Sequence, residues 1–377
     1  MLLINNFPSF KVKQNISFPM FKYYTGGNIG HCWIADAIRT ILPIKEGISN
    51  IYYDELIMHH NNSHIIVNAQ DWIKPQMDYG EAHLFVKKLK NFILKYKKPV
   101  ILLGLGLNNY NEKQKFGEFK KSIDKDLIDL LYVISDHCDL ISVRGEFTHD
   151  FLNLIGIKNS YVTGCPTMLL KKEINIDYQF KSNAKLAINC GYVNRNIKNK
   201  SYFVQDEDLL LNIFLEKNFD ENVAELYKKM SLEWFEQLLN LYKTKNLYLM
   251  PNFFSAIRKY KEFDLTVGSR LHGGIASLCA DVPTIVTNPD VRAKETTSAM
   301  GIPYFPELCN FKTGYFGQQH DINKIFESID WNEVSKKHKV YKSNFVYFFN
   351  KNKICIEDSL KKKIKNKIRS YEKIFYL

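Results

Sequence analysis

The fold can be argued from residues 263–295, FDLTVGSRLHGGIASLCADVPTIVTNPDVRAKE. The apolar run 263–267 ends in a glycine and a serine, a pattern that predicts a buried strand followed by a tight turn. Helical spacing begins at Leu271, with small residues that allow close packing on a sheet, and Pro283 ends it. The β-branched run 284–287 predicts the next strand. The stretch therefore predicts a β-α-β unit, whose ligands bind beyond the carboxyl ends of its strands.

Basic and imidazole side chains follow these two predicted strands. Arg270 and His272 lie on the first turn of the helix, where free backbone N–H groups favour an anion. Arg270 offers a planar fork for a carboxylate or phosphate, and His272 can carry a proton near neutral pH. Arg292 and Lys294 follow the second strand on a basic loop. The pattern predicts an anion site at the strand ends, with solvated side chains on ordinary loops as the alternative.

Two glycine-rich turns earlier in the chain predict further loops at strand ends. The run Phe21–Thr25 is predicted to be a strand, followed by a glycine loop and a helix over 31–42. The run 99–103 is predicted to be a buried strand that also ends in glycines. Such glycines permit the close approach of a ligand or simply of the next helix. The loop residues that we expect at the cleft are Asn28, Gly30, Gly104 and Gly106.

Arg144 stands in the same position as Arg270, at the end of a predicted strand and just before a helix. Its sequence context is S-V-R-G-E-F-T, residues 142–148. A cation there is suited to an anionic ligand, and a surface salt bridge to Glu146 or Asp150 is the alternative.

The motifs S-R-L-H-G-G (269–274) and S-V-R-G-E-F-T together resemble the polysaccharide pyruvyl transferase family, over most of residues 21–330. The resemblance implies two Rossmann-like α/β domains facing a cleft, the GT-B arrangement. It also implies transfer of an enolpyruvyl group from phosphoenolpyruvate to a sugar diol of a bacterial-type surface polysaccharide or its lipid-linked precursor. The product would be a cyclic pyruvate ketal.

The resemblance also implies roles for individual residues. His272 would be the acid–base residue, and phosphoenolpyruvate would be bound by Ser269, Arg144, Arg270, Arg292 and Lys294. Counted from His272 without gaps, Arg292 stands where family members carry a lysine. Arg195 is a displaced counterpart of a family arginine that follows the first strand of the second domain.

The chain departs from the family pattern at two positions. His31 stands where the glycine loop of the family ends in aspartate, and Cys165 replaces the aspartate of an aspartate-proline turn. We do not expect Cys165 to be reactive, because the sequence indicates no base beside it.

The predicted organisation has two α/β domains and a basic tail. An N-terminal Rossmann-like domain is expected over residues 1–175, a second one over 184–330, and a helical segment over 331–377. The net charge of +12 comes mostly from the tail, where 336–373 hold thirteen Lys or Arg against three acids, so nucleic acid is not the expected partner. In the tail, Ile364, Ile368, Tyr371 and Phe375 recur at helical spacing among lysines. This helix either lies on an anionic membrane surface or packs on the protein.

Other features limit the kind of protein. Seven scattered cysteines without a C-x-x-C pair fit a reducing cytoplasm. We therefore expect a cytoplasmic protein without a signal peptide, placed at most at the inner face of the membrane. We expect no metal, although His59, His60 and His64 cluster, and no cofactor beyond phosphoenolpyruvate as co-substrate. Two alternatives remain: a nucleotide-sugar glycosyltransferase of the same architecture, and a non-catalytic relative that binds membranes or polyanions.

Overall fold

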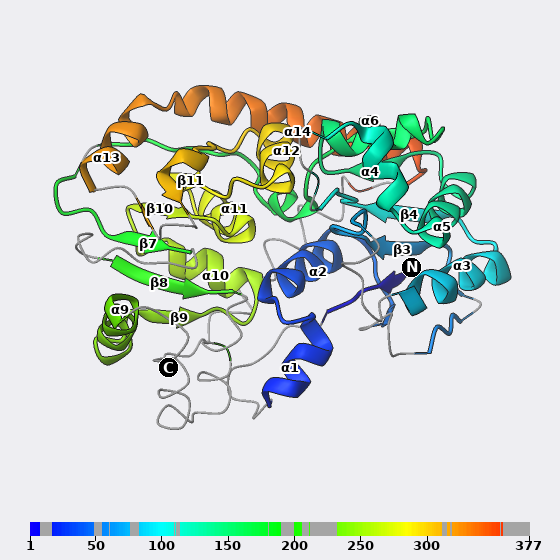
Figure 1. The fold of residues 1–377 in the computed structure, drawn as a ribbon, viewed down its shortest axis with the longest axis horizontal. Coiled ribbons are helices and arrows are strands. Elements are labelled where there is room, and N and C mark those ends of the chain that lie inside the picture. The colour runs from blue at the N-terminus through cyan, green and yellow to red at the C-terminus, as the bar shows by residue number, and fades with distance from the viewer. Residues whose placement is uncertain are drawn as a thin grey trace.

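The computed structural model describes residues 1–7, 17–48, 55–59, 61–75, 83–108, 110, 114–179, 181–189, 200–205, 211, 232–310, 315–316, 319–354 and 356. Figure 1 shows that the described chain forms two halves, each built on a parallel β-sheet with helices around it. Among the described helices, none is long and apolar enough to cross a membrane.

The first half contains a four-stranded sheet and a further pair of strands. Its elements are β1 (Leu2–Ile4), α1 (Phe18–Thr25), α2 (Ile29–Ile41), β2 (Glu46–Ile48), β3 (Ile65–Asn68), α3 (His83–Tyr96), β4 (Val100–Leu103), α4 (Phe116–Ser122), α5 (Lys125–Asp136), β5 (Ile141–Val143), α6 (Glu146–Leu154), β6 (Ser160–Val162) and the 3-10 helix η3 (Pro166–Leu170). The strand order is β2-β1-β3-β4, and a parallel bridge between Leu105 and Val143 joins the β5-β6 pair to it.

The second half contains a five-stranded parallel sheet and the long last helix. Its elements are β7 (Leu186–Ile188), β8 (Lys200–Val204), α9 (Leu232–Lys243), β9 (Leu247–Leu249), α10 (Phe253–Tyr260), β10 (Leu265–Gly268), α11 (Leu271–Cys279), β11 (Thr284–Val286), α12 (Val291–Met300), η4 (Pro306–Leu308), β12 (Cys309–Asn310), β13 (Tyr315–Phe316), α13 (Gln319–Ser328) and α14 (Trp331–Lys351). The strand order is β11-β10-β7-β8-β9, which is the doubly wound order of a Rossmann half. The predicted β-α-β unit is β10-α11-β11.

Each sheet has a point where the direction of its connections reverses. In the first half the reversal lies between β1 and β3, and in the second it lies between β7 and β10. Ligands of open parallel sheets bind beyond the carboxyl ends of strands at such points. The segments that follow β3 and β10 are therefore the places to look for a site. The expected fold class, two Rossmann-like α/β halves of the GT-B type, is confirmed.

Both faces of the first sheet are buried, as parallel sheets require. Successive residues of a strand point to opposite faces, so Leu2 and Ile4 pack in one apolar cluster with α3 and α5, whereas Leu3 packs in the other. The second cluster continues through α2 into the core of the second half. The two halves thus share one apolar core, and α2 lies in it.

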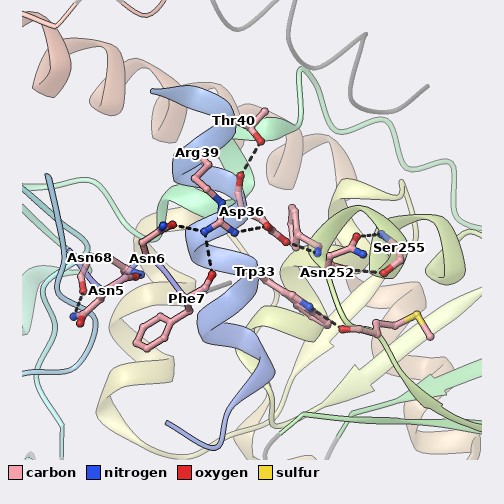
Figure 2. Close-up of polar contacts among 12 residues, drawn as sticks. Asn5, Asn6, Phe7, Trp33, Asp36, Arg39, Thr40, Asn68, Asn252 and Ser255 are labelled. Carbon is pink, nitrogen blue, oxygen red and sulfur yellow. Dashed lines mark hydrogen bonds and ion pairs between the residues drawn. The ribbon is translucent and has the colours of Figure 1, made fainter. Parts of the chain in front are cut away.

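Helix α2 also joins the halves through polar contacts, which Figure 2 shows. The indole N–H of Trp33 donates to the carbonyl of Met250 at 3.1 Å, and the backbone N–H of Phe253 donates to Asp36 at 3.1 Å. Asp36 in turn pairs with Arg39 at 2.6 Å. These contacts fix the start of α2 between the two sheets.

The segment Phe21–Thr25 is part of helix α1, so the prediction of a strand there was wrong. The helix begins at the N-cap Ser17 and has a proline in its first turn. It ends at Gly26, whose left-handed φ of 63° lets its N–H reach the carbonyl of Lys22. A five-residue segment rich in aromatic residues does not distinguish strand from helix, and here the caps decide it. The preceding strand is β1, in a region where the sequence shows little pattern.

Helix α14 returns from the second half to the first, as Figure 1 shows. The hydroxyl of Tyr341 donates to the carbonyl of Cys165 at 2.6 Å, and the side chain of Asn352 accepts from the backbone N–H of Leu140 at 3.2 Å. Its aromatic residues Phe345, Phe348 and Phe349 are buried. The first part of the predicted tail therefore packs on the protein. Ile364, Ile368, Tyr371 and Phe375 lie outside the described residues.

Candidate functional site

Glycines let β7 and α11 come together at the reversal point of the second sheet. A Cβ on Gly268 would lie 1.8 Å from Oδ1 of Asn189, and one on Gly273 would lie 2.1 Å from its Nδ2. A Cβ on Gly274 would approach Val286 of β11 to 3.1 Å. The small residues of the motif thus allow the start of α11 to lie directly on the strand ends, as expected.

Arg144 is buried at the end of β5, with only 4% of its surface exposed. It lies over the glycine-rich turn after β4, where a Cβ on Gly106 would be 2.9 Å from its Cδ and one on Gly104 would be 4.0 Å from its Nε. These glycines therefore make room for a side chain, rather than for a helix. Among the described residues, which include Glu146 and Asp150, Arg144 has no ion-pair partner, and its Nε has no hydrogen-bond partner. The salt-bridge alternative was wrong.

His272 lies between the two halves. A Cβ on Gly30, at the start of α2, would be 2.7 Å from its Nδ1, so only glycine fits there. Burial holds the pKa of His272 well below its usual range, and the charges of Arg144 and Arg292 lower it further, whereas Asp71 raises it. Its imidazole is consequently neutral near pH 7.

Cys165 has a base beside it, contrary to the sequence-based expectation. Nε2 of His272 lies 3.7 Å from its Sγ, and the hydroxyl of Thr167 lies 2.8 Å from the same sulfur. Both Cys165 and Thr167 are fully buried. The residue that replaces the family aspartate thus contacts the predicted acid–base residue.

Arg292 lies in the first turn of α12 rather than on a loop, which corrects the prediction for both Arg292 and Lys294. Asp290 is the N-cap of this helix and explains where it begins. Nη1 of Arg292 donates to Asp71 at 2.9 Å, and Nη2 donates to Asp290 at 3.1 Å. The contact with Asp71 crosses from the second half to the first.

Sequence analysis missed Asp71, which follows β3 at the reversal point of the first sheet. Burial raises the pKa of this carboxyl, but the positive charges of Arg292 and Arg144 outweigh it and hold the pKa well below the usual range. Asp71 is therefore an anion that faces the other charged groups of the site. Its position three residues after the end of β3 is a weaker form of the signal that identified Arg144, which follows β5 immediately.

His31 lies beside these charged groups, at the start of α2. Its Nδ1 lies 2.7 Å from the carbonyl of Thr25, which can only accept, so Nδ1 carries the proton. Its ring stacks on Phe7 with centroids 5.3 Å apart. Burial lowers the pKa of His31, so its imidazole is neutral near pH 7.

The other predicted site residues lie around this group. Asn28 is the N-cap of α2 and accepts from the N–H of Gly30 at 2.7 Å. Ser269 is 3% exposed, and its hydroxyl has no partner among the described residues. Arg270 is the half-buried N-cap of α11, and exposed Lys294 lies over the ring of Phe147 at 5.5 Å. Arg195 lies outside the described residues.

A second residue missed from sequence, Glu295, joins α12 to the start of α6. It is 3% exposed and accepts from the backbone N–H and hydroxyl of Thr148 at 3.0 and 2.8 Å. Gly145 is required there, because its Cβ would lie 2.5 Å from Cβ of Glu295. Burial raises the pKa of Glu295 to about 7, although Thr148 and Arg144 oppose the shift. Nothing in the sequence separates this glutamate from a solvated one.

We expect Glu295→Gln to remove a pH dependence of stability. A carboxyl whose pKa is higher in the folded state favours folding below its unfolded pKa, and this contribution is lost as the pH rises toward 7. A shift from 4.5 to about 7 corresponds to about 3 kcal/mol. Glutamine keeps the acceptor for Thr148, so the variant should be the more stable protein at pH 8. Denaturant unfolding at pH 5 and pH 8 measures this, and equal pH dependence in both proteins would contradict it.

Among the described residues, the site thus brings together Arg144, which has no ion-pair partner there, the paired Arg292, the neutral imidazoles of His31 and His272 and the carboxylate of Asp71. It is suited to binding a small anion beside an imidazole that can take up a proton. Among the described residues, no group of three or more His, Cys, Asp or Glu could hold a metal ion.

Comparisons with known proteins place the chain in a family. A model of the family described as polysaccharide pyruvyl transferase matches residues 12–291. No curated protein matches the chain.

Solved structures resemble the chain only distantly. They include Anabaena HepE in complex with UDP and glucose, with 8% identity over 82% of this chain and 79% of that one and a TM-score of 0.36. The UDP-GlcNAc 2-epimerase of Methanocaldococcus jannaschii has 12% identity over 77% and 76%, with a TM-score of 0.36. The UDP-N-acetylglucosamine 2-epimerase of Rickettsia bellii has 10% identity over 98% and 96%, with a TM-score of 0.39.

The family match spans both halves of the molecule, from the region before α1 to the start of α12, and so includes Arg144, His272 and the turns around them. The chain belongs to the polysaccharide pyruvyl transferase family, and it is a transferase.

Proposed function

We propose that this transferase moves an enolpyruvyl group from phosphoenolpyruvate to two hydroxyls of a sugar and leaves a pyruvate ketal. The observation that carries the proposal is the buried guanidinium of Arg144, which lacks a carboxylate partner among the described residues. A buried unpaired charge is costly, and an anionic ligand would compensate it. Phosphoenolpyruvate supplies both a carboxylate and a phosphate to such a site.

The surroundings of Arg144 support an anion with more than one charged group. Arg292 presents further N–H groups from the opposite half. Arg270 lies at the start of α11 with Ser269, whose hydroxyl has no partner in the part of the chain that the structure describes. Phosphate is the leaving group of the proposed reaction, so its growing charge must be stabilised where it forms. Fixed cations in a partly buried site supply this stabilisation.

The proposed reaction needs no net acid or base. One sugar hydroxyl adds to C2 of the donor, C3 gains a proton and becomes a methyl group, and the C2–O bond to phosphate breaks. The second hydroxyl then adds to C2 and closes the ketal. Of the two hydroxyl protons, one ends on the methyl group and the other on phosphate.

His272 is the proposed carrier of the proton to C3. Its imidazole is neutral in the free protein, since burial and two guanidinium groups lower its pKa. A bound anion offsets those positive charges, so the imidazole can take up a proton in the complex. General acid–base catalysis by a positioned histidine then requires a nitrogen within hydrogen-bond reach of the reacting group.

For the acceptor, we propose a diol of a surface polysaccharide or of its lipid-linked precursor. The match to a polysaccharide-modifying family supports a sugar acceptor. The thirteen basic residues of 336–373 support a contact with an anionic membrane surface from the cytoplasmic side, where a lipid-linked acceptor would be reached.

Incubation with phosphoenolpyruvate and candidate lipid-linked glycans tests the proposal. We expect phosphate release together with a glycan product that carries the added mass of a pyruvate ketal. Thermal-shift measurements with phosphoenolpyruvate and with UDP-sugars form the second arm. Stabilisation by a UDP-sugar but not by phosphoenolpyruvate would contradict the proposed donor and favour a glycosyltransferase.

A further inference from the structure

Asp71 is the carboxylate that links the first half to the predicted donor site of the second. It follows β3 at the reversal point of the first sheet, and its Oδ2 accepts from Nη1 of Arg292 at 2.9 Å. The same oxygen accepts from the side-chain amide of Asn108 at 2.9 Å, so the carboxylate is itself held in place. The side chains of Asp71 and Arg292 are 26% and 32% exposed, so water only partly screens the pair.

The two carboxylates on Arg292 have different anchors. Asp290 caps α12, the helix that carries Arg292, and its other oxygen accepts from the N–H of Ala293 at 2.6 Å. Asp290 therefore fixes Arg292 within its own half. Asp71 fixes it relative to the first half, where Arg144 lies.

We propose that Asp71 is a positioning residue that acts through Arg292 and sets its place relative to Arg144 across the two halves. A guanidinium has five N–H donors, and the bonds to Asp71 and Asp290 each occupy one, on different terminal nitrogens. The remaining donors are thereby held in a fixed direction for an anion. The inference rests on the proposed donor site, because it assigns Asp71 the task of shaping that site.

The same carboxylate sets the charge around His272. The groups that face this imidazole are Arg144 after β5, His31 on α2, Arg292 on α12, Asp71 after β3 and Cys165 before η3. Of these, Asp71 is the charge that raises the pKa of His272. Loss of its charge should therefore make the imidazole harder to protonate.

A double-mutant cycle in the full-length protein tests the inference. We expect Asp71→Asn to lower kcat/KM for phosphoenolpyruvate by at least about tenfold, because an asparagine cannot hold the guanidinium as a charged partner does. Arg292→Gln should lower kcat/KM for phosphoenolpyruvate by at least the same factor. Because Asp71 acts on the donor through Arg292, the double variant should bind phosphoenolpyruvate no more weakly than Arg292→Gln within about twofold. Additive losses of donor affinity, or an Asp71→Asn variant with kcat/KM within about twofold of wild type, would overturn the inference.

Two controls separate positioning from a general loss of stability. Asp281→Asn removes a comparable ion pair, to Lys171, away from the site and should leave kcat/KM unchanged. Asp71→Glu keeps the charge and should recover part of the activity. In Asp71→Asn, the limb of the pH profile of kcat/KM that reflects the protonation of His272 should move to lower pH. A protein that is merely destabilised would lose activity without this shift.

A measurement without donor keeps the inference separate from the proposed function. Nitrogen-15 NMR of the guanidinium groups should show hindered rotation of Arg292 in the wild type and free rotation in Asp71→Asn, with Arg292→Lys to assign the signal. If phosphoenolpyruvate does not bind the wild type, the proposed function fails whatever this signal shows. If the signal is unchanged by Asp71→Asn, the positioning role fails even when phosphoenolpyruvate binds.

Discussion

His272→Ala is expected to lower kcat for pyruvyl transfer by about 10²–10⁴-fold while the protein stays folded. His272 is the imidazole that lies among Arg144, Arg292 and Asp71, so it is the proposed proton carrier for C3 of the donor. Alanine leaves the close contact with Gly30 open rather than crowded, so the fold should tolerate it. Steady-state kinetics with phosphoenolpyruvate measures the effect.

Two comparisons make the His272 result specific. His137→Ala removes an imidazole bonded to the carbonyl of Val133, outside the site, and should leave turnover unchanged. Calorimetry of phosphoenolpyruvate binding in buffers of different ionisation enthalpy should show proton uptake by the wild type and little by His272→Ala. Turnover of His272→Ala close to that of the wild type would remove this residue from the mechanism.

Arg144→Met is expected to weaken donor binding by about 2–3 kcal/mol, which is roughly 30- to 150-fold in Kd. The reason is that Arg144 is buried without a carboxylate partner among the described residues, so its charge is available to the donor. Arg292 shares its charge with Asp71 and Asp290, and its loss should weaken binding less. Calorimetric titration with phosphoenolpyruvate measures both variants.

The same substitution should not destabilise the protein. Methionine keeps an unbranched side chain over Gly104 and Gly106 and removes a buried charge that lacks an ion-pair partner among the described residues. We therefore expect a thermal midpoint at or above that of the wild type, together with the loss of donor affinity. Unchanged affinity would exclude Arg144 from the donor site, and a large fall in the midpoint would show that its role is structural.

The sequence predicted correctly those helices and strands whose boundaries are marked by neighbouring residues. The β10-α11-β11 unit was predicted correctly because a strand, a glycine turn, a helix and a proline follow each other within 263–287. The strand that ends just before Arg144, β5, was found in the same way. Phe21–Thr25 was assigned to the wrong element because a short segment rich in aromatic residues fits either type, and the cap at Ser17 was not recognised.

Ligands of parallel sheets bind beyond the carboxyl ends of the strands, and this rule predicted where charged side chains gather. It did not predict which of these side chains contact each other. It identified Arg144 and His272, which belong to different halves. Asp71 and Arg292 are 221 residues apart, and Cys165 and His272 are 107 apart, so no spacing in the sequence connects them. For the same reason Cys165 was judged to have no base nearby.

By itself the sequence determined the parallel α/β class, the β-α-β unit and the family, since these depend on hydrophobic periodicity, turn residues and motifs within short stretches. Only the tertiary structure decided that Arg144 has no ion-pair partner among the described residues, that Arg292 is tied to Asp71, that Cys165 contacts His272 and that Glu295 is buried. Burial and charge pairing are set by segments far apart in the chain, and the two sheets bring those segments together only when α2 and α14 pack between and across them.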